Sequence, residues 1–229
     1  MMGKNHATSA AVTWLLFGGA AAATAGTVDM DPATFALGTL VAAGAGVAPD
    51  VDHPDSRASK TFGPVGQVAA AGIGAAAGGH RQRTHTLLFV IAMTAVTHWA
   101  VGASGPWPAT IVVALCVTLG IGLIGPSVGL PGAAGAAGLV LGAAAGWLVH
   151  SGTVDAGGWI TAAVAVGLCS HLVGDMLTPE GVKLLWPISS ARLGLPVFTT
   201  GGLIERVVGV GLLVVFVWLA ATSFVPGLI

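Results

Sequence analysis

Charged side chains are scarce in this sequence: Asp, Glu, Lys and Arg make up 7% of its 229 residues, against about a quarter in a soluble domain. Hydrophobic residues make up 55% and the mean hydropathy is +0.90, which excludes an ordinary soluble fold and indicates an integral membrane protein. The formal net charge is −1, and no basic run is longer than the stretch from Arg81 to Arg83. Nucleic acid is therefore excluded as a partner.

Cysteine is equally rare. The two cysteines, Cys116 and Cys169, both lie inside apolar stretches, which favours small core residues over a disulfide or metal ligands. Glycine, by contrast, is abundant at 36 residues. Small residues let membrane helices pack closely, so we expect a tight helical bundle. The Gly-rich stretch 132–146 fits either internal packing or contacts in a homo-oligomer, and its spacing does not choose between them.

Apolar runs long enough to cross ~30 Å of hydrocarbon recur along the chain. Most are separated by Asp, Pro or Gly residues, as at 29–32, 105–106, 125–126 and 155–158. The first run follows a single Lys and is long enough to be retained as a helix, so it is a poor signal peptide. The predicted fold is all-α, a single integral membrane domain over residues 1–229. It forms a polytopic transmembrane helical bundle of about seven spans near 8–27, 33–49, 86–102, 108–125, 131–149, 158–174 and 203–224.

The Gly/Ala segment 63–79 decides the topology, because it is apolar enough to enter the membrane but short and weakly hydrophobic. If this segment is re-entrant or buried against the bundle, all eight Lys and Arg residues fall on one side, which the positive-inside rule assigns to the cytoplasm. The same assumption places the His and Asp clusters on that side. We therefore predict that 63–79 does not cross; re-entrant backbone is tolerated where protein or a water-filled cavity covers it.

Ionisable residues in a membrane protein are costly to place and are a functional hypothesis by default. The loop from Pro49 to Asp55 holds three carboxylates and one imidazole. Such a density of anionic oxygen calls for a cation or a nearby Arg. His171 and Asp175 are spaced i, i+4, which on a helix presents both side chains on one face to a single metal ion.

His80 and His85 are five residues apart and suit a loop better than a regular helix. Arg81 and Arg83 add fixed positive charge beside them, which can orient a phosphate or carboxylate. Mixed His and Asp donors fit zinc, manganese or iron better than magnesium alone. The sequence therefore predicts one shared metal site on the basic side of the membrane.

Other polar residues favour plainer roles. Topology alone explains Arg57, Lys60 and Lys183. His98 lies in the middle of a span and His150 at the opposite end of another, so both are predicted to be hydrogen-bonded structural residues or surface groups.

Four motifs in order along the chain resemble those of a known family. They are an early histidine (His6), a Pro-Asp-x-Asp-His loop ending at His53, a His-Arg-x-x-Thr-His box from His80 to His85, and Ser-His-Leu-x-x-Asp-x-x-Thr-Pro-x-Gly from Ser170 to Gly181, followed by Leu-Trp-Pro. Together they look like the YdjM-like family of bacterial inner-membrane proteins, described as membrane-bound metal-dependent hydrolases, some of them LexA-regulated. The Ser that usually follows the second His of the box is Thr86 here, which keeps the hydroxyl.

The resemblance implies a multi-pass protein of the bacterial inner (cytoplasmic) membrane that hydrolyses its substrate with one or two divalent ions of Zn, Mn or Mg. It implies His80 as acid or base and Arg81 as the residue that holds an anionic group of the substrate. Asp50 would be a further ligand or a catalytic residue that orients the ligating imidazoles. The implied metal ligands are Asp52, His53, His85, His171 and Asp175, with His6 as a further ligand.

A site at the membrane surface suits an amphiphilic substrate. The expected partners are therefore membrane lipids, and the expected substrate is a phospholipid or another lipid-linked phosphoester, with a lipid amide or ester as the alternative. Two other functions stay open. A metal-ion or proton-coupled transporter requires polar groups at mid-membrane depth, where only His98 lies. A non-catalytic membrane scaffold would use metal only to fix loops 50–62 and 80–85.

Overall fold

The computed structural model describes residues 1–27, 30–103, 105–124 and 134–224. Within these ranges the chain forms helices joined by irregular segments, with an isolated antiparallel bridge between Val182 and Leu193. The all-α prediction is confirmed. The helices are α1 (Gly3–Thr24), α2 (Pro32–Ala45), η1 (Ala48–Asp52), α3 (Arg57–Lys60), α4 (Gly63–Ala77), η2 (Arg83–His85), α5 (Leu87–Gly102), α6 (Trp107–Ile124), α7 (Ala134–His150), α8 (Gly158–Met176) and α9 (Leu203–Phe224).

The predicted spans coincide with helices. The stretches 3–24, 32–52, 158–176 and 203–224 are long and apolar enough to cross a membrane, and α5, α6 and α7 are shorter apolar helices. The predicted break at 125–126 and the start of the span 131–149 lie outside the described residues. The prediction of a multi-pass membrane bundle is confirmed.

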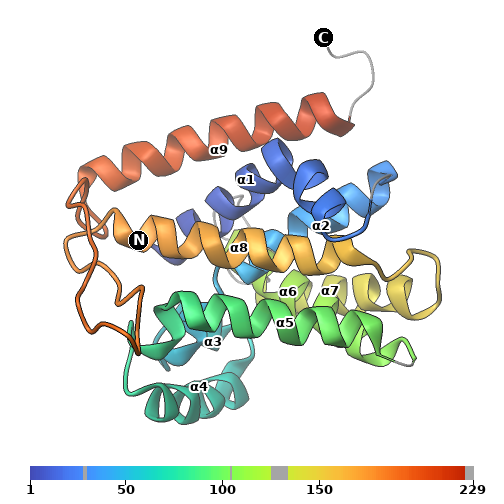
Figure 1. The fold of residues 1–229 in the computed structure, drawn as a ribbon. Coiled ribbons are helices and arrows are strands. Elements are labelled where there is room, and N and C mark those ends of the chain that lie inside the picture. Colours follow the sequence, from blue (N-terminus) through green and yellow to red (C-terminus); the bar gives the residue numbers. More distant parts are fainter. Residues whose placement is uncertain (28–29, 104, 125–133, 225–229) are drawn as a thin grey trace.

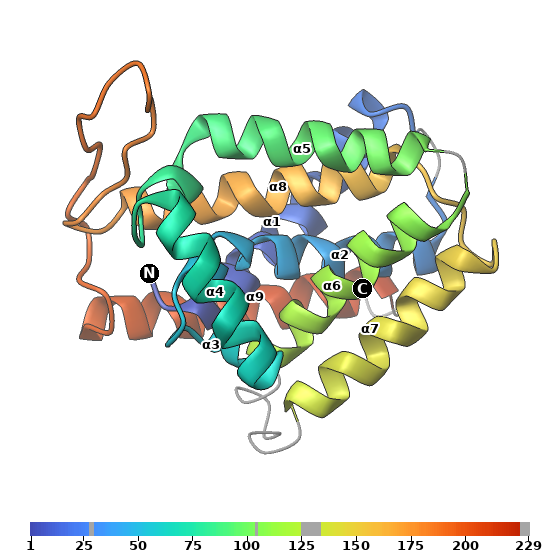
Figure 2. The ribbon, with the colours of Figure 1, turned by 90° about the horizontal axis from the view of Figure 1, so that it is seen from below.

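The bundle is built around α1, α2 and α8, which contact one another. Helix α5 packs on α8, and α9 packs on α1 (Figure 1). Helices α6 and α7 form an antiparallel hairpin that reaches the centre through contacts of α6 with α2. In Figure 2 this hairpin is inclined to α5 and α8.

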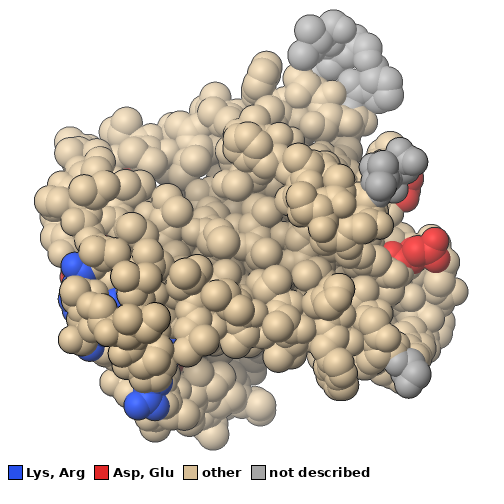
Figure 3. All heavy atoms as spheres, viewed as in Figure 1, with Lys and Arg blue, Asp and Glu red and all other residues tan. Residues whose placement is uncertain are grey.

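In the view of Figure 3 the visible basic side chains gather at one end of the molecule, and a few acidic side chains lie at the opposite end. The basic residues belong to the start of α1, to α3, to η2 and the connection before it, to the segment after α8 and to the start of α9. All of these lie at the end where the N-terminus lies in Figure 1. We call this the site end, and the positive-inside rule assigns it to the cytoplasm.

Helix α4 stays at the site end, as predicted for 63–79. It packs on α3 and η1, and in Figure 2 it runs across the direction of α5 and α8. Its glycines permit this contact, because a Cβ at Gly74 would lie 2.4 Å from the carbonyl oxygen of Asp52. The outer face remains exposed, with Val65 at 79% and Val68 at 75%. The segment is therefore a regular helix lying against the bundle, and the loops before and after it meet on one side.

Glycines set the spacing of the spanning helices. A Cβ at Gly44 of α2 would lie 1.8 Å from the Cys116 carbonyl oxygen of α6, and one at Gly167 of α8 would lie 2.4 Å from the Ala42 carbonyl oxygen. Between α6 and α7, Gly138, Gly142 and Gly146 contact the backbone or side chains of α6. This glycine row therefore serves internal packing, which the sequence left open.

One prediction about the core is wrong. Cys116 is partly buried, but Cys169 is exposed on the surface of α8, and both are free thiols. A helix face turned toward lipid is as apolar as one turned toward the core, so the apolar surroundings of Cys169 in the sequence do not separate the two positions.

Candidate metal centre

Five segments of the chain bring polar side chains together at the site end. They are the start of α1 with His6, η1 with Asp50 and Asp52, the turn before η2, η2 itself with His85, and the end of α8. His6, Asp52, His85, His171 and Asp175 are all at most 2% exposed. A buried set of this kind requires the groups to satisfy one another or a bound ion.

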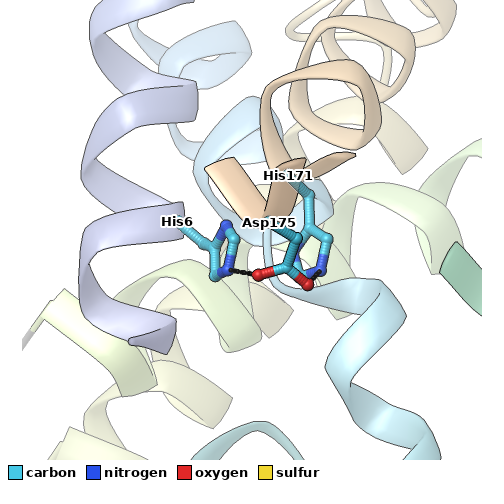
Figure 4. A group of neighbouring side chains, drawn as sticks. All are labelled: His6, His171 and Asp175. Atoms are coloured by element: carbon cyan, nitrogen blue, oxygen red, sulfur yellow. Dashed lines mark hydrogen bonds and ion pairs between the residues drawn. The ribbon is translucent and has the colours of Figure 1, made fainter. Parts of the chain in front are cut away.

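The end of α8 supplies the centre of this cluster. His171 and Asp175 lie one turn apart on the helix, as their spacing predicted, with His171 Nε2 3.5 Å from Asp175 Oδ2. The His6 ring stacks on that of His171 with 3.9 Å between ring centroids, and its Nε2 lies 3.2 Å from Asp175 Oδ1. Figure 4 shows the carboxylate between the two rings, with one oxygen turned toward each.

Four donor atoms from three segments converge, and one of them belongs to Asp175. His85 Nε2 lies 3.5 Å from Asp175 Oδ2 and 3.6 Å from Asp50 Oδ1, and His171 Nε2 lies 3.8 Å from Asp50 Oδ1. We call these four residues the His85–His171–Asp50–Asp175 cluster. Among the described residues, three of its buried donor atoms have no hydrogen-bond partner: His85 Nε2, His171 Nε2 and Asp175 Oδ2.

The far side of each imidazole is fixed by a hydrogen bond. His171 Nδ1 lies 2.8 Å from the Gly46 carbonyl oxygen, which only accepts, so this nitrogen carries the proton. His85 Nδ1 lies 2.9 Å from the Thr84 hydroxyl, which donates to Asp52 Oδ2 at 2.5 Å. Both Nε2 atoms therefore carry no proton, and their lone pairs point into the cluster. Metal-ligating histidines require this arrangement.

The donor set fits a small divalent cation. Ligands at the corners of a tetrahedron with bonds of about 2.1 Å lie about 3.4 Å apart. The four His–Asp separations within the cluster, from 3.5 to 3.8 Å, need only a small contraction to reach that value. Two further groups, His6–His171–Asp175 and Asp52–His80–His85, also bring three donors within 4.8 Å of one another. These buried His and Asp groups could hold a metal ion.

Arg81 neutralises part of the acidic charge. Its NH2 group donates to Asp175 Oδ1 at 2.9 Å, and its NH1 group donates to Glu180 Oε2 at 2.8 Å. The Met1 amino group also donates to Asp175 Oδ1, at 2.6 Å. One oxygen of Asp175 is thus held by cationic donors while the other faces the cluster.

A tight turn carries Arg81 to this position. Gly78, in the left-handed region at φ 81°, ends α4, and Gly79 follows at φ 107°. Arg81 itself has φ 55°, which is uncommon for a residue with a side chain and costs roughly 1–3 kcal/mol. The ion pairs with Asp175 and Glu180 stabilise this conformation.

His80 forms a second pair with Asp52. Its Nδ1 lies 2.7 Å from Asp52 Oδ1, and its side chain is 35% exposed. This hydrogen bond raises the pKa of His80, whereas burial lowers the pKa of His85. The two imidazoles therefore differ: His80 favours the charged form and His85 the neutral form. A cavity of about 420 Å³ opens beside His80, lined among others by Asp50, His53, His80, Arg81, Arg57 and Glu180.

Eight of the nine predicted site residues belong to the connected cluster: His6, Asp50, Asp52, His80, Arg81, His85, His171 and Asp175. His53 lies at its edge, where its Nδ1 accepts a hydrogen bond from the Asp55 amide and its ring meets that of His80 edge-on. Asp50, more than Asp52, faces the two Nε2 atoms. His98 is exposed on α5, and His150 packs against Trp107 and Trp147 at the opposite end of the bundle.

Sequence reasoning missed Glu205 and Asn5. Glu205, in the first turn of α9, is fully buried and accepts hydrogen bonds from the Asn5 amide group at 3.0 Å and from the amides of Met2 and Gly201 at 2.5 and 2.6 Å. These bonds tie α9 to the start of α1, next to His6. An acidic residue inside an apolar run was the available signal.

Comparison with known proteins matches the sequence of this chain to one family. The family model described as YdjM inner membrane protein matches residues 1–227. The inner membrane proteins YdjM of Escherichia coli (strain K12) and Shigella flexneri are each 26% identical to the chain over 172 residues. The matched part is 75% of this chain and 60% of each relative. No solved structure gives a significant match.

Proposed function

The chain belongs to the family of YdjM inner membrane proteins, and on that premise we propose that it is a membrane-bound metal-dependent hydrolase. The observation that supports this best is the His85–His171–Asp50–Asp175 cluster, in which three buried donors lack partners and both imidazoles are fixed from behind. In this proposal the four residues hold one divalent ion, and zinc or manganese suits the mixed nitrogen and oxygen donors.

A divalent ion in such a site polarises the bond to be cleaved and activates water as a nucleophile near neutral pH. The protein residues divide the remaining work. His80, paired with Asp52 and exposed to the cavity, transfers the proton. Arg81 holds Asp175 in place and lines the same cavity, where it faces an anionic group of the substrate.

The location of the cavity supports a proposal for the substrate class. It opens at the site end of a membrane bundle and is lined by Arg57, Arg81, His53 and His80 together with acidic groups. We therefore propose a phosphoester in a phospholipid or another lipid-linked molecule as the substrate, with a lipid ester or amide as the alternative.

The alternatives gain less support. A transporter needs polar residues that continue from the cluster toward the other face. Within the described ranges, His98 points outward from α5 and His150 packs among tryptophans at the far end. A scaffold would share the geometry but has no need of the cavity beside His80.

Turnover by purified protein tests the proposal. Protein loaded with Zn, Mn or Mg should hydrolyse at least one member of a panel of phosphomonoesters, phosphodiesters and phospholipids. Asp175→Asn should abolish that turnover while thermal unfolding stays cooperative. Asp155→Asn, the same change on an exposed residue at the opposite end, should leave turnover intact. Absence of turnover with every metal would favour the scaffold.

A further inference from the structure

An apolar groove lies between α8 and α9, with α1 as its floor. Its volume is about 570 Å³. The α9 wall includes Val208 and Leu212, and α1 contributes Ser9 and Thr13. The α8 wall follows one face of the helix, with Ala165, Val166, Cys169, Ser170, Val173 and Gly174. Both walls belong to helices that are long and apolar enough to cross the membrane, so the groove adjoins lipid.

The groove runs along α8 over about the thickness of one membrane leaflet. It extends along α8 from Ala165 to Leu177, twelve positions apart, which is about 18 Å of helix at 1.5 Å per residue. One leaflet of hydrocarbon is about 15 Å deep. The lower-numbered end lies within the span, and Leu177 directly follows α8 at the site end.

The groove also adjoins the candidate metal centre. Met1 lines both the groove and the 420 Å³ polar cavity. At Gly174, which precedes Asp175, a Cβ would lie 3.1 Å from His6 Nδ1. That nitrogen is fully buried and has no hydrogen-bond partner among the described residues. The same Cβ would lie 2.8 Å from Met1 Cε, so the Met1 side chain and the His6 ring fill the space between the groove and the cluster at this position.

We propose that this groove holds one hydrocarbon chain of a lipid from the site-end leaflet, whose head group enters the polar cavity beside His80 and Arg81. The inference deepens the proposed function and rests on it for the reaction of that head group. A second apolar cavity of about 490 Å³ lies beside α5 and α6, but the residues that line it include none of those lining the polar cavity. Continuity with the polar cavity through Met1 thus favours the α8–α9 groove.

Photo-crosslinking in nanodiscs tests the occupant directly. Phosphatidylglycerol with a diazirine on one acyl chain should give adducts concentrated on residues 165–177 of α8 and 208–212 of α9. Val208→Trp should fill the groove and reduce these adducts by about tenfold, which corresponds to ~1.4 kcal/mol of binding. Val210→Trp, on a 63% exposed residue of the same helix that does not line the groove, should leave them unchanged. Equal adducts in both variants, or labelling spread evenly over all exposed helices, would overturn the proposal.

The native cysteines give a second measurement that does not depend on a bulky substitution. Cys169 lines the groove, and Cys116 lines the 490 Å³ cavity. In the single-cysteine variants Cys116→Ala and Cys169→Ala, added phosphatidylglycerol should slow alkylation of Cys169 by a membrane-permeant maleimide and leave Cys116 unaffected. Equal protection of both thiols would contradict a specific chain site.

Metal content, measured on the same preparations, separates this inference from the proposed function. Val208→Trp should retain bound metal, because Val208 lies outside the cluster. If the wild-type protein binds metal but gives no adducts in the groove, the lipid site is refuted and the proposed function is not. Groove adducts in a protein that binds no metal would support the lipid site and refute the hydrolase.

Discussion

The α6–α7 hairpin and the site end of α8 both depend on glycine, but the close approach of backbone segments that glycine permits has a different role in each. In the hairpin, Gly142 lets α7 pack against Thr118 and Ala114 of α6. At the site end, Gly46 offers its carbonyl to His171, and Gly174 leaves room for the His6 ring. The first arrangement gains packing alone, whereas the second brings buried donor atoms within a few ångströms. Small residues thus serve helix packing in one region and bring the donor atoms of the candidate metal site together in the other.

The largest difference between the regions should appear on removing a ligand. His171→Ala should lower metal affinity by about 100-fold or more, since even residues that only orient a ligand change affinity by about 10- to 100-fold. His150→Ala, which removes an imidazole packed on Trp107 at the opposite end, should leave metal content unchanged. Elemental analysis of detergent-purified protein measures both. Equal metal content in the two variants would remove the distinction between the two ends.

A smaller effect on metal affinity is expected when a residue that orients a ligand is changed. Thr84→Val removes the hydroxyl that joins His85 Nδ1 to Asp52, so metal affinity should fall by about 10-fold. Thr97→Val is the matched control, because within the described residues the buried Thr97 hydroxyl bonds only to the Met93 carbonyl of its own helix. Competition with a fluorescent chelator gives both affinities. A loss of the same size in each variant would show that the effect is general destabilisation.

The smallest effect on the metal, and a clear one on stability, is expected in the hairpin. A Cβ at Gly142 would lie 2.1 Å from Thr118 Oγ1, so Gly142→Ala should cost about 1–3 kcal/mol of stability through overpacking. Gly211→Ala, where no atom of the described residues lies within 4 Å of the new Cβ, should be close to neutral. Thermal unfolding in detergent measures the stability, and both variants should retain wild-type metal content. Loss of metal in Gly142→Ala would show that the two regions are coupled.

The sequence predicted much of this fold because span length and the spacing of His171 and Asp175 are local properties. The charge bias predicted correctly that 63–79 stays at one end. It did not predict that Asp50 and Asp52 diverge. In η1 their side chains separate, with Asp50 facing His171 and Asp52 facing His80 and Thr84. That division depends on where η2 and α8 lie, which the loop sequence does not contain.

Two other features escaped prediction, each for its own physical reason. Lipid and protein interior are equally apolar, so hydropathy did not show that Cys169 faces outward. Glu205 stands in an apolar run, and its partner Asn5 is 200 residues away in the sequence, so neither suggests the other without the packing of α9 on α1.

X-ray absorption at the metal edge of the purified protein is the most direct test of the central claim, that His85, His171, Asp50 and Asp175 together bind a divalent ion. With zinc bound, the account predicts nitrogen and oxygen ligands at about 2.0–2.1 Å and scattering from two imidazoles, reduced to one in His171→Ala. A protein that binds no zinc, or one whose zinc spectrum lacks imidazole and is unchanged in His171→Ala, would contradict it.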